Sequence, residues 1–221
     1  MGAPRAIALC QSFSGALEFQ VGHWAEADEA LHESIDLFHQ IGAADGEALS
    51  YQRLGMLLTA QARLDEGLSA LENGAAAATH AKLRAHLQGR LYASMARNRL
   101  LAGDLSAADE ALSLGQALTQ SHGHCALCEA LLLPAAVSVR IAQGDLDAAK
   151  GYCSQLDEAT TRYGSRAWVA LAAQARGELA VAQGDIETAV AYYSAARSGF
   201  QEARNEYAVT QCAEALARLQ K

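Results

Sequence analysis

Apolar and small residues recur along this 221-residue chain with a long, regular period. The period is clearest at five small residues that each precede a new apolar segment: Gly22, Ala62, Gly103, Gly144 and Gly184. Consecutive members are 40 or 41 residues apart, and three of them begin the sequence Gly-Asp-(Leu/Ile). That sequence is typical of a tight turn followed by a helix with an acidic residue at its positive end. The chain is therefore expected to consist of about five helix-turn-helix repeats.

Three other positions of the repeat keep the same type of side chain. A small residue stands five positions after the turn: Ala27, Gly67, Ala108, Ala149 and Ala189. Four positions further on, the side chains are larger: Leu31, Leu71, Leu112, Cys153 and Tyr193. Seven positions before the turn, four of the five residues are Gly or Ala: Gly15, Gly55, Ala96, Val137 and Gly177. Small residues allow the two helices of a hairpin to approach, and large ones fill the space between hairpins.

These patterns predict an all-α chain with one domain, 1–221, and no linker. The expected repeats are 5–42, 46–82, 86–123, 126–164 and 166–204, followed by a capping helix at 206–219. The expected helices within the repeats are 5–21, 24–41, 46–60, 63–80, 86–102, 105–122, 126–143, 146–162, 166–183 and 186–203. Gly42, Gly123 and Gly164 share one repeat position and are predicted to be left-handed C-terminal caps.

Composition agrees with helices and limits the classes of partner. Strong helix formers such as Ala, Leu and Glu are abundant, and runs of Val and Ile, from which strands are built, are scarce. The net charge of −8 disfavours non-specific binding to nucleic acid, which needs a basic surface. No direct contact with nucleic acid is therefore expected.

The sequence also bears on the compartment. No segment approaches 18 consecutive apolar residues, so no membrane span is expected. The first residues lack the long apolar region of a secretory signal, and the five cysteines, an odd number, do not suggest a disulfide framework. These features indicate a cytoplasmic protein.

The repeat resembles the tetratricopeptide repeat (TPR). The second repeat follows that family's pattern closely at Tyr51, Leu54, Gly55, Leu58, Gly67 and Leu71. Because its period exceeds the common 34 residues, the chain is similar to the long-repeat sensor regions of bacterial regulators of two kinds, LuxR/maltose-regulator activators and peptide-pheromone receptors. The resemblance implies a right-handed superhelical solenoid that binds a protein or peptide within a transcriptional or signalling assembly. Neither a Walker loop nor a helix-turn-helix DNA-binding module is visible, so in such a regulator this chain would be the sensor or scaffold part.

In TPR proteins the first helix of each repeat lines a concave groove. The resemblance places these residues in the groove: Gln52, Met56, Arg90, Arg97, Pro134, Ser138, Gln174 and Glu178. Arg90 and Arg97 are seven residues apart and share a helix face, from which they could bind a partner's carboxylate. The alternative is a solvated or internally paired helix face.

One local motif contains metal-type ligands: His122, His124, Cys125 and Cys128, between the third and fourth repeats. Cys125 and Cys128 have the spacing that lets two thiolates bind one ion or form a disulfide at a helix start. Zinc or copper(I) would suit these ligands. Thiol redox activity and a purely structural role are the alternatives.

No catalytic motif is visible. The chain has no Gly-x-Ser-x-Gly, no His-Glu-x-x-His and no phosphate loop. Asp104, Asp145 and Asp185 recur with the repeat as turn residues, so they do not indicate an acid/base pair. The chain is expected not to be an enzyme.

Aromatic side chains gather near the C-terminal end, at Tyr192, Tyr193, Phe200 and Tyr207. If the capping helix left them uncovered, they would form an apolar patch that supports a homodimer.

Overall fold

The computed structural model describes the backbone of residues 2–220 and the side chains of residues 3–121 and 123–220. Within residues 2–220 it contains helices and no β-strand. The helices are α1 (Gly2–Val21), α2 (Trp24–Gln40), α3 (Ala44–Ala60), α4 (Leu64–Ala78), α5 (Arg84–Leu101), α6 (Leu105–His122), α7 (Ala126–Ala142), α8 (Leu146–Tyr163), α9 (Arg166–Ala182), α10 (Ile186–Glu202) and α11 (Glu206–Leu219). None of these helices is long and apolar enough to cross a bilayer. The all-α prediction is confirmed, and every predicted helix boundary lies within three residues of the observed one.

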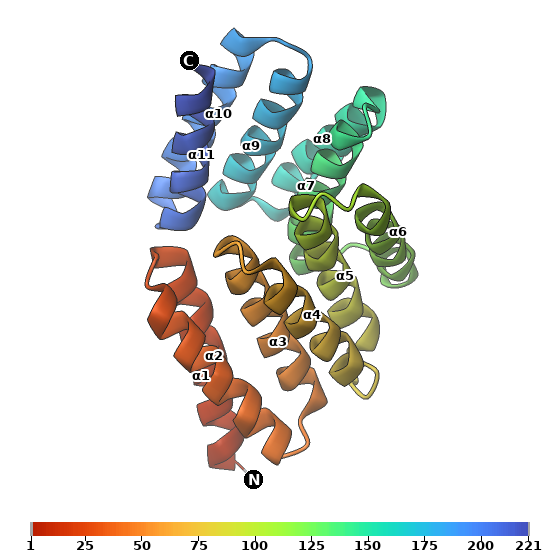
Figure 1. Cartoon of the computed structure of the whole chain (residues 1–221), viewed down its shortest axis with the longest axis vertical. Helices are drawn as coiled ribbons and strands as arrows, with labels where there is room; N and C mark the ends of the chain where they lie inside the picture. Colours follow the sequence, from red (N-terminus) through yellow and green to blue (C-terminus); the bar gives the residue numbers. More distant parts are fainter. Residues whose placement is uncertain (1, 221) are drawn as a thin grey trace. The chain divides into compact units, whose positions relative to one another are not determined.

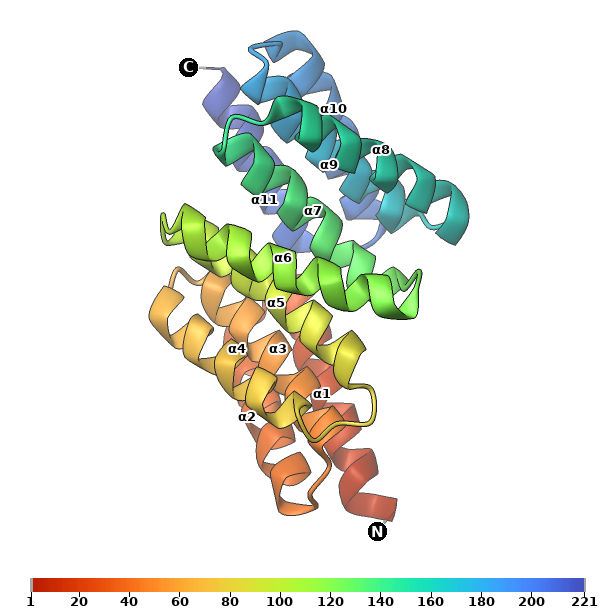
Figure 2. The ribbon, with the colours of Figure 1, turned by 90° about the vertical axis from the view of Figure 1, so that its right-hand side faces the viewer.

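The chain divides between Cys128 and Glu129 into two compact units. In the first unit, α1–α2, α3–α4 and α5–α6 form consecutive hairpins, and each hairpin packs on the next (Figure 1). Figure 2 shows the α3–α4 and α5–α6 hairpins from the side, and α7 beside α8 in the second unit. There α8 packs on α9, α9 on α10 and α10 on α11. The predicted order of five hairpins and a final helix is thus confirmed, whereas a single domain over 1–221 stays a prediction.

The turn inside each hairpin has a left-handed backbone. The φ angle is 92° at Gly22, 81° at Gly103, 78° at Gly144 and 77° at Gly184. Glycine accepts this conformation because it has no Cβ to clash with the neighbouring backbone. Ala62 occupies the same position in the second repeat with a φ of 59° and lacks this advantage.

The aspartate that follows three of these glycines caps the second helix of its hairpin. Asp104 Oδ1 accepts a hydrogen bond from the backbone N–H of Ala107 at 3.0 Å, and Asp145 does the same for Ala148. Asp185 accepts one from Thr188 at 3.1 Å. Each carboxylate satisfies an N–H group that has no partner inside its helix. The predicted structural role of these aspartates is confirmed.

Close packing of the two helices of a hairpin depends on the small residues. A Cβ added at Gly55 in α3 would lie 2.5 Å from Leu71 Cγ and 3.0 Å from the carbonyl oxygen of Gly67, both in α4. A Cβ at Gly15 would lie 2.6 Å from Leu31 Cγ in the same way. Leu31 and Leu71 are both fully buried. Small residues thus let the two helices of a hairpin approach, as predicted, and Leu31 and Leu71 pack against them within the hairpin.

The C-terminal helix covers the last hairpin. Tyr193 and Phe200 are 7% and 4% exposed, and they share a core with Cys212 and Leu216 of α11. The capping helix therefore leaves neither of these two residues in an exposed aromatic patch. Apolar side chains on one face of α11 complete the core, so Tyr193 and Phe200 cannot supply a dimer contact.

Candidate functional site

In the first unit, a layer of buried polar side chains joins consecutive hairpins. Ser50 Oγ of α3 lies 2.8 Å from Ser12 Oγ of α1 and 2.9 Å from Ser34 Oγ of α2. Ser12, Ser34 and Ser50 are all fully buried. A buried hydroxyl without a partner would be costly, so these bonds fix the positions of the helices that carry them.

The layer continues from α3 to α5 through Gln52. Gln52 is only 2% exposed, and its Nε2 donates a hydrogen bond to Ser94 Oγ at 3.1 Å. Its Oε1 accepts one from Arg90 Nη2 at 3.2 Å. The resemblance placed Gln52 on a groove surface, but the side chain lies beneath that surface and holds Arg90 in position.

Two arginines, Arg53 and Arg90, contact this layer and have no acidic partner among the described residues. Arg53 Nη1 donates to Ser12 Oγ at 2.7 Å, and Arg90 donates to Gln52, so both bonds are to neutral groups. Arg90 Nε is buried and has no hydrogen-bond partner. Burial and the charge of Arg90 lower the pKa of Arg53 to about 10, and burial lowers the pKa of Arg90 as well. The charge of Arg90 thus disfavours the charged form of Arg53.

An exposed aromatic ring adjoins this pair. Phe13 of α1 is 55% exposed, and the Arg53 guanidinium carbon lies 4.6 Å from the centre of its ring. A guanidinium over an aromatic face is a favourable arrangement that still leaves other N–H groups for a ligand. Phe13, Arg53 and Arg90 therefore form what we call the arginine site. Only Arg90 was predicted from the sequence.

The other predicted groove residues are half-buried. Met56 and Arg97 belong to the first unit. In the second unit, Ser138 Oγ of α7 donates a hydrogen bond to Glu178 Oε2 of α9 at 2.7 Å. These two side chains therefore bind each other within the unit. Pro134 lies within α7, where its carbonyl oxygen is 3.2 Å from Ser138 Oγ, and Gln174 is half-buried on α9. Whether any of them contacts a partner stays a prediction.

A second group of functional side chains lies where α7 begins. His86 near the start of α5, Cys125 just before α7 and Cys128 in its first turn place one ligand atom each within 4.8 Å of the others. Cys128 is fully buried, and its Sγ lies 3.8 Å from His86 Nδ1. Cys125 and His86 are half-buried. We call these three residues the His-Cys cluster.

Of the four ligands expected from the sequence, the structure brings Cys125 and Cys128 together. His124 is exposed and is not among the residues of the cluster, and the side chain of His122 lies outside the described residues. Gly123 has a φ of 73° and a ψ of −160°, which is not the left-handed helical cap predicted for it. This extended conformation is accessible mainly to glycine, and it leads the chain away from α6 to the cysteines.

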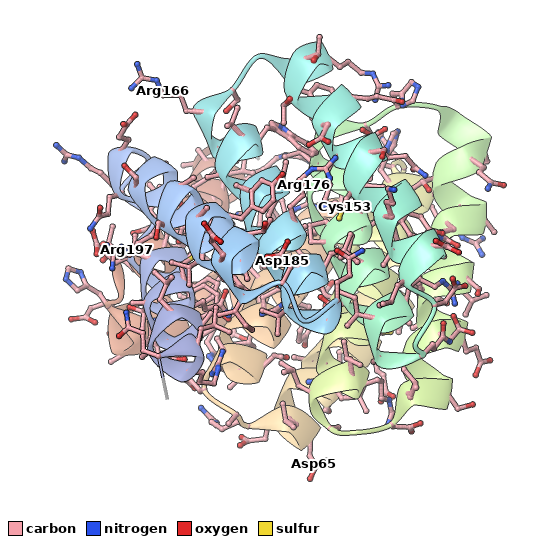
Figure 3. The ribbon with its side chains drawn as sticks, turned by 90° about the horizontal axis from the view of Figure 1, so that it is seen from above. Asp65, Cys153, Arg166, Arg176, Asp185 and Arg197 are labelled. Carbon is pink, nitrogen blue, oxygen red and sulfur yellow. The ribbon has the colours of Figure 1, made fainter. Side chains whose placement is uncertain are left out.

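The remaining cysteines stand apart from the cluster. Cys153 is fully buried in α8, and burial raises the pKa of its thiol to about 11. Figure 3 labels Cys153 together with Arg176. The guanidinium of Arg176 pairs with the carboxylate of Asp157. Cys10 is exposed, and Cys212 is a buried residue of α11. The prediction that Cys153 belongs to the core is confirmed.

Local motifs in the sequence did not identify three functional residues, His86, Arg53 and Phe13. Each has a partner about one repeat away: His86 and Cys128 are 42 residues apart, and Ser12 and Arg53 are 41 apart. Equivalent helices of adjacent hairpins pack side by side, so residues one period apart become neighbours. A search at that separation would have found both pairs.

Comparison with known proteins finds a family with the same helical-repeat architecture. A family model described as the MalT-like TPR region matches residues 5–220. The match spans both compact units and includes the arginine site and the His-Cys cluster. No curated protein matches the chain.

Proposed function

The chain belongs to the MalT-like TPR family, and we propose that it binds a protein or peptide, with the arginine site recognising an acidic group of that partner. In this proposal the helical repeats are a scaffold, and the role is regulatory, within a transcriptional or signalling assembly in the cytoplasm. Binding, rather than catalysis, is its function.

The observation that carries the proposal is the absence of an acidic partner for Arg53 and Arg90 among the described residues. Partly buried charges are normally paired, because removal from water is costly without a counterion. Here the helices hold two guanidinium groups against neutral partners and close enough to repel each other. A carboxylate of a bound partner would remove that repulsion.

The geometry of the groups suits such a ligand. A guanidinium presents N–H donors in a planar fork, which matches the two oxygens of a carboxylate. The bond to Gln52 uses Nη2 of Arg90 and leaves Nε without a partner, but Nε is buried, so a carboxylate reaches it only when the side chains around it move. The exposed ring of Phe13 offers an apolar contact beside the charges. The partner is thus expected to carry Asp, Glu or a free C-terminus next to an apolar residue.

Binding of a short-peptide library tests this function. Labelled peptides containing Asp, Glu or a C-terminal carboxylate are compared by fluorescence anisotropy with their Asn, Gln and amidated counterparts. We expect the acidic members to bind, and Arg53→Gln or Arg90→Gln to weaken binding by at least about tenfold, since hydrogen bonds to charged groups contribute about 1.5–3 kcal/mol.

Arg166→Gln is the matched control. Arg166 is 83% exposed in the second unit and pairs with Glu202 at 2.6 Å, so its replacement should leave peptide binding unchanged. Equal binding of acidic and neutral peptides, or unchanged binding after substitution of both Arg53 and Arg90, would refute the proposal.

A further inference from the structure

Three ligand-type side chains from two separate segments converge in the His-Cys cluster. Cys125 and Cys128 come from one motif, but His86 stands 42 residues before Cys128, on another helix. Packing alone accounts for the buried thiol of Cys128. It does not require a second thiol and an imidazole nitrogen within 4.8 Å of it.

The distances are close to those of a metal-binding site. With bonds of about 2.3 Å to sulfur and 2.0–2.1 Å to nitrogen, tetrahedral geometry places two sulfurs about 3.8 Å apart and nitrogen about 3.6 Å from sulfur. His86 Nδ1 already lies 3.8 Å from Cys128 Sγ. The longest separation in the cluster, within 4.8 Å, needs to shorten by only about 1 Å, a change that side-chain rotation can supply.

The two sulfur ligands lie at the start of one helix. Cys125 directly precedes α7, and Cys128 lies in its first turn. The guanidinium of Arg90 interacts electrostatically with both sulfur atoms. The nitrogen ligand comes from another helix, since His86 lies near the start of α5.

We infer that His86, Cys125 and Cys128 bind one thiophilic cation, zinc or copper(I). Two thiolates and an imidazole are the ligands that these ions prefer, and three ligands suit trigonal copper(I) or zinc with a fourth position open. On binding, each thiol gives its proton to solvent, and neutral His86 donates a ring-nitrogen lone pair. The ion would join the start of α5 to the start of α7.

Metal titration of the reduced full chain without oxygen tests the site. Copper(I) and zinc are supplied separately in competition with chromophoric chelators, and cobalt(II) serves as a spectroscopic probe for zinc. We expect one ion per chain and sulfur-to-cobalt charge-transfer absorption. Cys125→Ser and His86→Ala should each lower affinity at least about tenfold. Cys125 and His86 are only half-buried, so both variants are expected to fold, and circular dichroism checks this.

Two further variants make the result specific. Cys10→Ser changes an exposed thiol in α1 and should leave affinity unchanged. His124→Ala should have a smaller effect than His86→Ala, because His124 does not belong to the cluster. Failure of the reduced protein to take up either ion would overturn the inference. Formation of a Cys125–Cys128 disulfide in oxidised protein would not restore it. Affinity that survives in His86→Ala but falls in His124→Ala would overturn it as well.

Discussion

At Ala62 the chain has a left-handed backbone, φ 59°, where the other four hairpins have glycine. For a residue with a Cβ, that conformation costs about 1–2 kcal/mol. No hydrogen bond or packing contact of the side chain is needed to explain it, because the turn itself requires a positive φ. The fold therefore carries a small, local strain in its second repeat.

Ala62→Gly is expected to increase the free energy of unfolding by about 0.5–1 kcal/mol, the lost strain being partly offset by the greater flexibility of unfolded glycine. Urea denaturation measures it. Ala102→Gly is the control, because Ala102 has an ordinary φ of −74° at the end of α5 and its replacement should destabilise. A destabilised Ala62→Gly protein would contradict this reading of the turn.

The cap at Asp185 makes stability depend on pH. Hydrogen bonds from the Thr188 hydroxyl and, to a smaller extent, from the Thr188 backbone N–H lower the pKa of the carboxyl in the folded state. Such a group contributes stability above its unfolded pKa, and the contribution is lost as the pH falls through the folded pKa. Asp185→Ala should therefore destabilise the chain at pH 7 and have a smaller effect in acid below the folded pKa. Thermal unfolding of both proteins over this range measures the difference, and a gap that widened in acid would disprove the cap's role.

At the scale of the helices, the sequence was sufficient to predict the hairpins but not the contacts between them. Turn glycines and aspartates fix where helices start and end, and these signals are local. The contact of Gly55 with Leu71 shows how the two helices of one hairpin meet. By contrast, the partners of Arg90 and His86 depend on the angle and offset between neighbouring hairpins. Those quantities are set by many side chains together, so no local motif revealed them.

Gly55→Ala tests the close approach of α3 and α4. Its Cβ would lie 2.5 Å from Leu71 Cγ, so we expect a loss of about 1–3 kcal/mol in unfolding free energy. Gly151→Ala is the matched control, because a Cβ there meets nothing within 4 Å, and its higher helix propensity should stabilise by about 0.5–1 kcal/mol. Denaturation curves of the two variants should shift in opposite directions. A stabilising Gly55→Ala would show that the helices can move apart without cost.

For the whole molecule, stability and binding place opposite demands on Arg53 and Arg90. The chain has a net charge of −8, yet Arg53 and Arg90 lack acidic partners among the described residues. Such an arrangement is unfavourable for the fold alone and becomes favourable when a carboxylate is bound. Binding sites often keep groups of this kind because function requires them.

Arg90→Met should leave the free energy of unfolding unchanged or increased while it weakens binding of acidic peptides, because burial disfavours the charge of Arg90 and no carboxylate pairs with it among the described residues. Arg176→Met provides the comparison, since Arg176 pairs with Asp157. Its loss should cost about 0.5 kcal/mol without affecting peptide binding. Denaturation together with anisotropy measures both quantities. A strongly destabilised Arg90→Met protein would mean that Arg90 mainly supports the fold.

Nuclear magnetic resonance of the side-chain Nε–Hε groups of Arg53 and Arg90 tests whether a partner's acidic group binds these two residues. On addition of the tightest-binding acidic peptide, we expect the Arg90 Nε–Hε signal to shift as this donor, unpartnered in the free protein, gains a carboxylate oxygen. The Arg53 signal should shift with it, and that of Arg166 should stay in place. Saturation of the protein with peptide while the Arg53 and Arg90 signals remain unchanged would contradict the claim.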